Sequence, residues 1–359
     1  MKILIISLAG IGDSLMLSPA LKVLRENKPH AEIHVITMLR GAYEIYSNNR
    51  DINKLIHFDF LNEGYFKSLR FVYKMRKEKY DLSINVYPMN RREYNFISFL
   101  IGAKERLGHY YNHQNLRNLN FLHTKYIKED DTRHNVEENI ELLSLLGINA
   151  PDVPPLNLKL PEENPEFSKR WFAERKIDER DLVIGFHAGS ATLKNHIQRR
   201  WNPDNFASLG TALIEKYNAK ILIFGGPEEQ PLKKYTNEKM NKSGFTVDTE
   251  SLFDTIYIMK YCRIFITNDS ALMHIAAALN LNTIALFGPT HEEWVHPWNT
   301  TYKIVRSGFD CDACFYYSTR PLTCKYKDTP FACIRSLTVD DVLQHTNEFL
   351  KEINIKNKL

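Results

Sequence analysis

The sequence predicts an α/β protein built from two domains, each with a parallel β-sheet covered by helices on both faces. At 359 residues the chain exceeds what one hydrophobic core usually serves. Short, unbroken apolar runs alternate with amphipathic segments, which is typical of buried parallel strands and their crossover helices. Five of the fifteen prolines fall between residues 151 and 165, where they oppose helix and central strand. We therefore expect two Rossmann-like domains that face each other across a cleft, joined by a linker that acts as a hinge.

The elements follow one another in the order that such domains need. We expect the first domain at residues 1–155, the second at 156–335, and a final helix at 336–359 that packs back on the first domain. The apolar runs expected to form strands are residues 2–7, 32–38, 54–58 and 81–88 before the linker, and 182–190, 220–229, 263–270 and 283–290 after it. The clearest helical segments are residues 14–27, 202–217 and 338–353, the last with Thr338 as its cap. In such sheets ligands bind outside the carboxyl ends of the strands, so the loops after these runs are the candidate sites.

The first of these loops, LAGIGDSL at residues 8–15, resembles a dinucleotide-binding turn. Gly10 and Gly12 are in place, but Leu15 occupies the third glycine position, which argues against NAD. The turn presents Asp13 at the head of a helix. Asp13 is then either a helix-capping acid, worth about 0.5 to 2 kcal/mol, or a general base.

In the second domain, Gly189 and Ser190 end the run LVIGFHAGS, and Arg199 and Arg200 follow just before the helix that Pro203 helps to start. Two guanidinium groups near a strand end suit an anion that needs several fixed donors. A solvated surface charge is the alternative.

The next loop, FGGPEEQ, offers a glycine for close backbone approach and two acids. Gly225 would let a ligand approach the backbone, and Glu228 and Glu229 would accept hydrogen bonds from ribose hydroxyl groups. Helix capping by the two acids is the alternative.

The run TNDSALMHIAAALNLNTIALFGPT, residues 267–290, places a helix start directly after a strand. A helix that begins at Asp269 and Ser270 directs free N–H groups, including that of Ala271, and a partial positive charge at the same edge of the sheet. His274, about one turn into the helix, either reaches the same anion or is a core residue.

Four of the five cysteines lie within 23 positions, at Cys311, Cys314, Cys324 and Cys333. This spacing suits a structural, tetrahedral thiolate site for zinc or iron. Free thiols or a disulfide are the alternatives.

Charge and hydropathy limit the partners and the location. Residues 91–128 carry seven cations against two acids, which predicts either a solvated face or a docking surface for an acidic substrate or an anionic lipid headgroup. No nucleic-acid motif accompanies them, so we expect no nucleic-acid partner. No segment approaches the ~20 apolar residues of a membrane span, and we expect a cytoplasmic protein with peripheral contact to the inner membrane surface.

Five ordered motifs give the chain a resemblance to glycosyltransferase family 9, the ADP-heptose:lipopolysaccharide heptosyltransferases. They are GIGDSLMLSPAL, GAKERLGH with HNVEENIELLSLLG, FHAGS with RRWNPDNFASL, FGGPEE, and TNDSALMHIAAALNLNTIALFGPT. The chain departs from the family pattern at Arg199 and Arg200, with an inserted Asn202, where a lysine and a Trp-Pro pair are common. Ala271 also stands where the family often has glycine.

The resemblance implies the GT-B fold and an inverting transfer of heptose from an ADP-sugar to an acidic glycolipid or glycan, such as the lipopolysaccharide core. Asp13 would be the general base, and Arg199 or Arg200, the helix amides and His274 would stabilise the departing diphosphate without a catalytic metal ion or other cofactor. Some relatives carry a similar cysteine cluster. Two alternatives stay open: a GT-B enzyme with another nucleotide-sugar donor or a protein acceptor, and a non-catalytic nucleotide-binding homologue.

Overall fold

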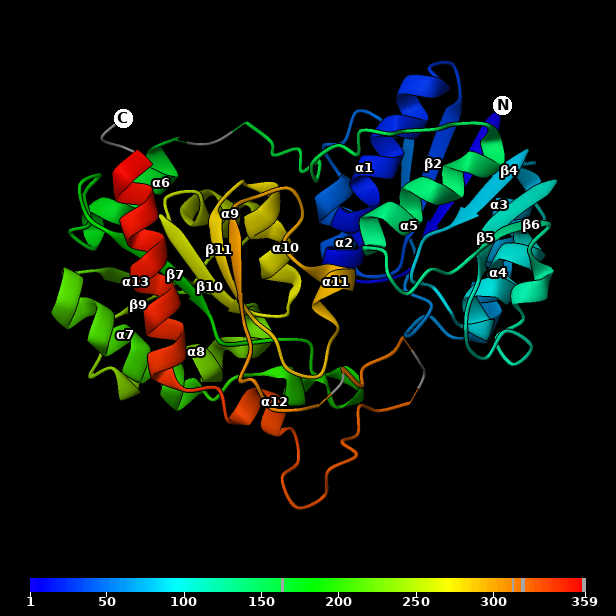
Figure 1. Cartoon of the computed structure of the whole chain (residues 1–359). Helices are drawn as coiled ribbons and strands as arrows, with labels where there is room; N and C mark the ends of the chain where they lie inside the picture. Colours follow the sequence, from blue (N-terminus) through cyan, green and yellow to red (C-terminus); the bar gives the residue numbers. More distant parts are fainter. Residues whose placement is uncertain (163–164, 312, 318–319, 357–359) are drawn as a thin grey trace. The chain divides into compact units, whose positions relative to one another are not determined.

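The computed structural model describes residues 1–162, 165–311, 313–317 and 320–356. The chain divides into two units (Figure 1). The first contains Met1–Leu160 and Tyr317, and the second contains Pro161–Tyr316 and the chain from Arg320 onward. Among the described residues, no helix combines the length and the apolar character needed to cross a membrane.

The first unit is built around a six-stranded parallel sheet in the order β3-β2-β1-β4-β5-β6. Its strands are β1 (Lys2–Ser7), β2 (Glu32–Thr37), β3 (Lys54–His57), β4 (Leu82–Asn85), β5 (Glu105–Tyr110) and β6 (Lys125–Lys128). The helices are α1 (Ile11–Asn27), α2 (Arg40–Tyr46), α3 (Tyr65–Lys77), α4 (Arg92–Ile101), η1 (Asn120–Leu122), α5 (Asn135–Glu141) and η2 (Leu142–Leu146). Both faces of the central strand β1 are covered by other parts of the unit, and the strand is accordingly apolar on both. Within the sheet Ile5 pairs with Val35 on one side and with Ile84 on the other, and all three side chains are buried.

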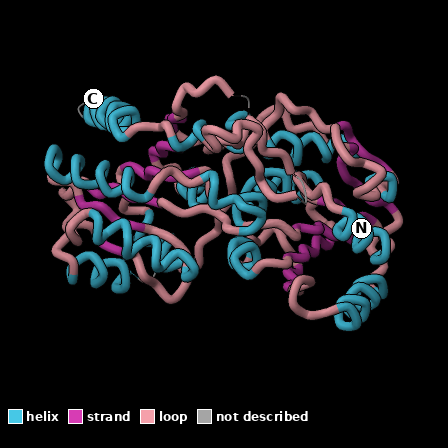
Figure 2. Tube along the Cα trace, turned by 90° about the horizontal axis from the view of Figure 1, so that it is seen from below, coloured by secondary structure: helices cyan, strands magenta, loops and turns pink. Residues whose placement is uncertain are grey.

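The second unit repeats this plan, with the strand order β12-β11-β10-β7-β8-β9. Its strands are β7 (Val183–His187), β8 (Lys220–Ile223), β9 (Phe245–Thr246), β10 (Ile264–Asn268), β11 (Asn282–Leu286) and β12 (Tyr302–Val305). The helices are α6 (Pro165–Glu174), η3 (Leu193–Arg199), α7 (Pro203–Tyr217), η4 (Pro227–Glu229), α8 (Gln230–Lys239), α9 (Leu252–Met259), α10 (Ala271–Ala278), α11 (Glu292–Val295), α12 (Ala332–Arg335) and α13 (Val339–Lys356). Figure 2 shows strands and covering helices in each unit. The predicted fold class of paired parallel sheets is confirmed.

The proline-rich segment has no helix or strand in residues 147–162. The units separate at residue 160, five residues beyond the predicted boundary. Two contacts hold the first part of the segment on the first unit: Leu156 is buried, and the Asn157 N–H donates to Ser18 Oγ at 2.7 Å.

The C-terminal helix α13 belongs to the second unit, where it packs against α7 and β12, whereas the sequence led us to expect a helix that packs on the first unit (Figure 1). Its cap is as predicted: the Asp341 N–H donates to Thr338 Oγ1, and the Thr338 N–H donates to Asp341 Oδ2. The apolar stripe of the helix, Val342, Phe349 and Leu350, is buried in the core of the second unit. An amphipathic stripe requires a partner but does not say which sheet supplies it.

Candidate functional site

The switch point of the second unit lies between β7 and β10, because the chain winds outward from β7 in one direction and from β10 in the other. Both strands are fully buried and end in polar residues, His187 on β7 and Asn268 on β10. These two strands pair in register and β8 pairs with β7, so the loops that follow all three start at one edge of the sheet.

His187 links two of these loops. Its Nδ1 lies 2.8 Å from Ser270 Oγ, and its Nε2 lies 3.0 Å from Glu229 Oε2. The sequence analysis did not include His187 in the site, because it is the last residue of an apolar run. Its position inside the FHAGS motif was the available signal.

Arg200 and Glu229 extend this network. An Arg200 Nη lies 3.2 Å from Glu229 Oε1, and Arg200 Nε donates to Ser190 Oγ at 3.2 Å. Burial acts to raise the pKa of Glu229, but the hydrogen bond from His187, the Gly226 N–H and the charge of Arg200 outweigh it and hold that pKa below its usual value. Glu229 is therefore a carboxylate at neutral pH, fixed between a guanidinium and an imidazole.

The second arginine makes a separate ion pair. An Arg199 Nη donates to Asp269 Oδ2 at 2.7 Å, both side chains are nearly buried, and the guanidinium lies over the Phe315 ring. Arg199 Nε is buried without a hydrogen-bond partner among the described residues, and so is Nδ1 of His274. Unpaired buried donors of this kind are unusual, and a ligand is one of the explanations for them.

Asn268 holds the arginine loop in place. Its Oδ1 accepts from the Trp201 N–H at 2.9 Å, and its Nδ2 donates to the Ala188 carbonyl at 2.9 Å. Trp201 is fully buried, and its indole N–H donates to the Leu337 carbonyl. The inserted Asn202 caps α7, since its side chain accepts from the Asp204 N–H. The arginine pair is thus fixed from the core side.

Gly189 is required for this packing. A Cβ on Gly189 would lie 1.8 Å from Glu229 Oε1 and 2.7 Å from His187 Nε2. At Gly225 a Cβ would lie 3.0 Å from Glu229 Oε2. Both predicted glycines therefore make room for Glu229, whereas Glu228 is exposed.

Helix α10 begins at Ala271, with Ser270 as its N-cap residue. The Ser270 side chain makes no capping hydrogen bond and contacts His187 and Thr267 instead. The first amide groups of α10 are thus not capped by that hydroxyl, as the predicted anion site requires.

His274 is 4% exposed, so its side chain is buried in the unit. Burial lowers the pKa of His274 to about 4. The charge of Asp269 opposes this shift, and the charges of His296 and Arg199 add to it. At neutral pH the ring is neutral, and it can act on an anion only as an N–H donor and not as a cation.

In the first unit, Asp13 lies in the first turn of α1, directly after β1. Its Oδ2 lies 3.3 Å from the Gly10 N–H, so it caps the helix, and it is partly exposed. Gly12 is in the same turn. The unit's own switch point lies between β1 and β4, which places Asp13 where a ligand of this unit would bind.

None of the four clustered cysteines forms a disulfide bond in the part of the chain that the structure describes. Burial, followed by the charges of the neighbouring thiols, raises the pKa of Cys333 to about 11. Within the described ranges, no three His, Cys, Asp or Glu side chains form a group that could hold a metal ion. The structure therefore does not support the predicted metal site.

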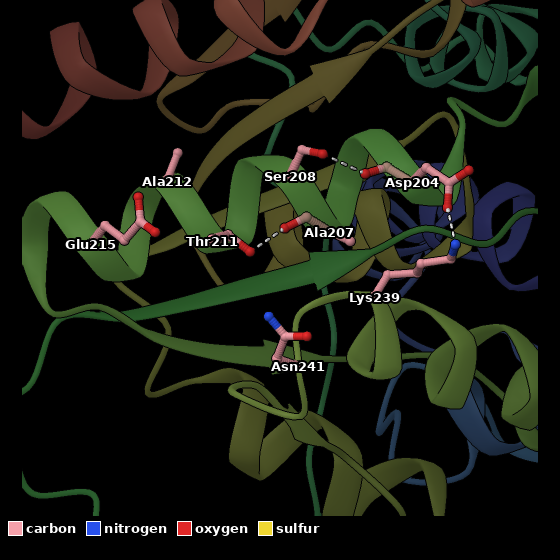
Figure 3. A pocket seen from close by; sticks show the side chains of 8 residues that line it. All are labelled: Asp204, Ala207, Ser208, Thr211, Ala212, Glu215, Lys239 and Asn241. Atoms are coloured by element: carbon pink, nitrogen blue, oxygen red, sulfur yellow. Dashed lines mark hydrogen bonds and ion pairs between the residues drawn. The ribbon is translucent and has the colours of Figure 1, made fainter.

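A pocket on the second unit lies along one face of α7 and the end of α8 (Figure 3). Two of the residues that line it, Lys239 and Asp204, form an ion pair at 4.0 Å. None of the strand-end residues described above lines it, and we do not assign it to the site.

Two Rossmann-like units in one chain are the architecture of the GT-B glycosyltransferases, and here the second unit presents Arg199 and Arg200 at its switch point. The model of glycosyltransferase family 9 (heptosyltransferase) matches residues 68–324, and the chain belongs to this family.

Individual relatives support the same assignment. Lipooligosaccharide heptosyltransferase 2 of Campylobacter jejuni is 25% identical over 365 residues, covering 99% of this chain and 100% of the relative. The solved structure of Escherichia coli ADP-heptose lipopolysaccharide heptosyltransferase II has a TM-score of 0.72 at 20% identity and covers 99% of this chain and 100% of its own. The iron-containing dodecameric glycosyltransferase TibC of enterotoxigenic E. coli has a TM-score of 0.58 at 12% identity, covering 98% of this chain and 76% of its own. The two structures show the shared GT-B fold.

Proposed function

We propose that this protein transfers heptose, or a related sugar, from an ADP-sugar to a lipopolysaccharide core or a similar glycan acceptor, with inversion at the anomeric carbon. The observation that carries the proposal is the network at the switch point of the second unit, where Arg199 and Arg200 are fixed beside the uncapped start of α10. Two guanidinium groups and helix amides are the donors that a nucleoside diphosphate requires. The names of the family's heptosyltransferases favour ADP-heptose as the donor.

In this scheme Asp13 removes the proton of the acceptor hydroxyl as its oxygen attacks the anomeric carbon. The bond from that carbon to the diphosphate oxygen breaks at the same time, and ADP leaves with the electron pair. Arg199, Arg200 and the amides of Ser270 and Ala271 stabilise the charge on the leaving diphosphate. The ribose hydroxyls would be bound near Gly225, Glu228 and Glu229. No catalytic metal ion is part of the scheme, and we expect activity to persist in EDTA.

The first test is a thermal-shift panel with ADP, UDP, GDP, CDP and NAD. A ligand at about 100 times its dissociation constant should add ~2.7 kcal/mol of stability. We expect selective stabilisation by ADP, followed by ADP release from ADP-heptose with a heptose-bearing core acceptor. Stabilisation by UDP or GDP would replace the donor. No response to any nucleotide would favour a non-catalytic homologue.

A second test addresses the acceptor side. The anomeric configuration of the product, measured by NMR, should be opposite to that of the donor. Retention would contradict Asp13 as a simple general base, since a double displacement needs a nucleophile on the enzyme.

The structural metal at the four cysteines stays a prediction. Its support is the spacing of four thiols and the iron in the name of TibC, and the described residues do not gather a ligand set for it. Metal analysis of the purified protein decides the question: one zinc or iron per chain that is lost in Cys311→Ser would support it. A metal-free, fully folded protein would establish free thiols.

We also propose that the protein acts at the inner face of the cytoplasmic membrane, where a lipid-linked acceptor would be presented.

A further inference from the structure

Helix α3 of the first unit exposes large aromatic side chains. Phe66 is 86% exposed, Tyr65 is 72% exposed and Tyr73 is 60% exposed, and Leu69 lies between them. Tyr65, Leu69 and Tyr73 are spaced four residues apart, so they share one face of the helix. Contiguous exposed apolar side chains of this size mark interaction sites in soluble proteins.

These side chains do not belong to the core packing of α3. The inward face of the helix is supplied by Phe71, Val72 and Met75: Val72 and Met75 are buried, and the Phe71 ring stacks on Phe58 at 4.1 Å. The helix thus buries one apolar face and exposes a second one. The fold alone gives no reason for the second.

Cations surround the exposed aromatic residues. The thirteen residues of α3 include no acid, and its basic residues are Lys67, Arg70, Lys74, Arg76 and Lys77. Among the described residues Arg70 and Lys74 make no ion pair or hydrogen bond, and Lys77 lies over the Tyr73 ring. A helix with exposed aromatic side chains and unpaired cations is typical of segments that lie in a membrane interface.

The neighbouring helix α4 also exposes aromatic side chains. It packs beside α3, with an Arg76 Nη donating to the Leu100 carbonyl, and it exposes Phe96 and Phe99. The loop of η1, beside α4, exposes Leu116 and Phe121. We call these exposed side chains of α3, α4 and the η1 loop the aromatic–basic face.

The basic zone expected at residues 91–128 contributes less charge than the sequence suggested. Lys104 pairs with Asp81 and Lys125 pairs with Glu105, while Arg106 donates to backbone carbonyls. His109 and His123, which lie in the same stretch, are buried. In that zone Arg91, Arg117 and Lys128 make no ion pair among the described residues. Helix α3 adds Arg70, Lys74 and Lys77 to this unpaired positive charge, whereas its Lys67 pairs with Glu63.

We propose that the aromatic–basic face docks the protein on an anionic phospholipid bilayer, with the aromatic rings at the headgroup boundary and the α3 cations on lipid phosphates. A second copy of the chain fits the face poorly, because a symmetric contact would place α3 cations opposite α3 cations. The inference deepens the proposed function, since a lipid-linked acceptor would then be held at the surface where the first unit docks.

The test is co-sedimentation of the full-length protein with vesicles of phosphatidylglycerol and phosphatidylethanolamine, and with vesicles of phosphatidylcholine alone. We expect binding to the anionic vesicles only, weakened by salt. Phe66→Ser with Tyr73→Ser should reduce binding at least about tenfold. Arg70→Gln with Lys74→Gln should reduce it by about fivefold per cation. Lys234→Gln with Tyr235→Ser, an exposed pair on α8 of the second unit, is the matched control and should bind like the wild type.

The outcomes separate this inference from the proposed function. ADP-induced stabilisation, and transfer to a delipidated core oligosaccharide, should be unchanged in all these variants, which also shows that they fold. Asp13→Asn should bind vesicles normally. The docking face would be overturned, whatever the enzyme assay shows, if the wild-type protein did not bind anionic vesicles. It would also be overturned if the α3 variants bound them as well as the wild type does. A loss of self-association in the α3 variants, measured by sedimentation velocity, would overturn it in favour of a second copy.

Discussion

The two units share one strand order but differ in the chemistry of their strand ends. In the second unit the switch point is charged, with Arg199 on Asp269 and Arg200 on Glu229. In the first unit the loops after β4 and β5 are held mostly by amides and hydroxyls, for example Asn118 Nδ2 on Asn90 Oδ1 and the Met89 N–H on Tyr111 Oη. One buried acid, Glu129, accepts hydrogen bonds from both loops, and no arginine lies beside it in these contacts. The sheet determines where a ligand binds, and the loops determine which ligand. A charged edge suits a diphosphate, and amides and hydroxyls suit a sugar.

Among the changes that test this difference between the units, we expect the largest effect on catalysis at Asp13, the acid that follows β1 in the first unit. Asp13→Asn keeps an oxygen for the Gly10 N–H but removes the base, so kcat should fall roughly 10²- to 10⁴-fold. ADP affinity, assigned to the second unit, should not change. Asp59→Asn, in an exposed turn of the same unit, is the control. Equal loss of ADP affinity in Asp13→Asn would break the division of roles between the units.

The next effect is expected at the ion pair of the second unit. Arg200→Met leaves the Glu229 carboxylate without its cation, and we expect a loss of about 2 kcal/mol in the free energy of unfolding, less than for a fully buried pair. ADP affinity should fall as well. Lys104→Met, which breaks an exposed pair with Asp81 in the first unit, should leave stability nearly unchanged.

A double variant separates stability from binding. Arg200→Met with Glu229→Gln removes both charges and should recover most of the stability, measured by urea unfolding. ADP affinity should stay low, because the guanidinium is still missing. Recovery of ADP affinity in the double variant would show that Arg200 orders the loop and does not contact the diphosphate.

The sequence predicted the sheets better than it predicted the side-chain network. Central strands such as residues 2–7 and 263–268 are unbroken apolar runs, and the structure confirms them. The edge strand β6, with the sequence KYIK and mostly exposed, and the two-residue β9 carry no such signal. Local pattern detects apolar runs, which the edge strand β3 still has but β6 and β9 lack.

A second limit on prediction from the sequence is that side chains far apart in the chain pair with one another. The sequence placed Arg199 and Arg200 near a strand end, but it did not pair Arg200 with Glu229, 29 residues further along the chain. His187 was missed for the same reason: its partners, Ser270 and Glu229, come from two other strand ends. Such contacts depend on the strand order, which no local window contains. The partner of α13 was wrong because an apolar stripe is equally consistent with either sheet.

The two units should share one property, a loss of stability in acid caused by a buried histidine. Each buries a histidine whose pKa burial lowers to about 4, His123 in the first unit and His274 in the second. Since an unfolded histidine titrates near its ordinary pKa of about 6.5, the unfolded state alone binds the proton between these values. Stability is fully present above about pH 6.5 and falls toward pH 4, by about 3 kcal/mol per histidine.

Calorimetry at neutral pH and at about pH 5 measures this effect. His123→Gln and His274→Gln should each reduce the loss of stability on acidification, whatever they cost at neutral pH. A variant with the wild-type acid sensitivity would show that its histidine is already protonated, and that the buried environment differs between the two units.

The two glycine turns differ in the room that they leave for a side chain. Gly189→Ala in the second unit would place a Cβ 1.8 Å from Glu229 Oε1, so Glu229 must leave its position between His187 and Arg200. We expect a loss of about 1 to 3 kcal/mol in stability and weaker ADP binding. In the first unit Gly10→Ala meets nothing nearer than Asp13 Oδ2 at 4.0 Å, and its backbone is extended, so stability should hardly change. If Gly10→Ala nevertheless abolished transfer while ADP binding persisted, the open space beside Asp13 would be where the acceptor approaches. If both variants behaved like the wild type, the crowded charged edge of the second unit would be ruled out as the nucleotide site.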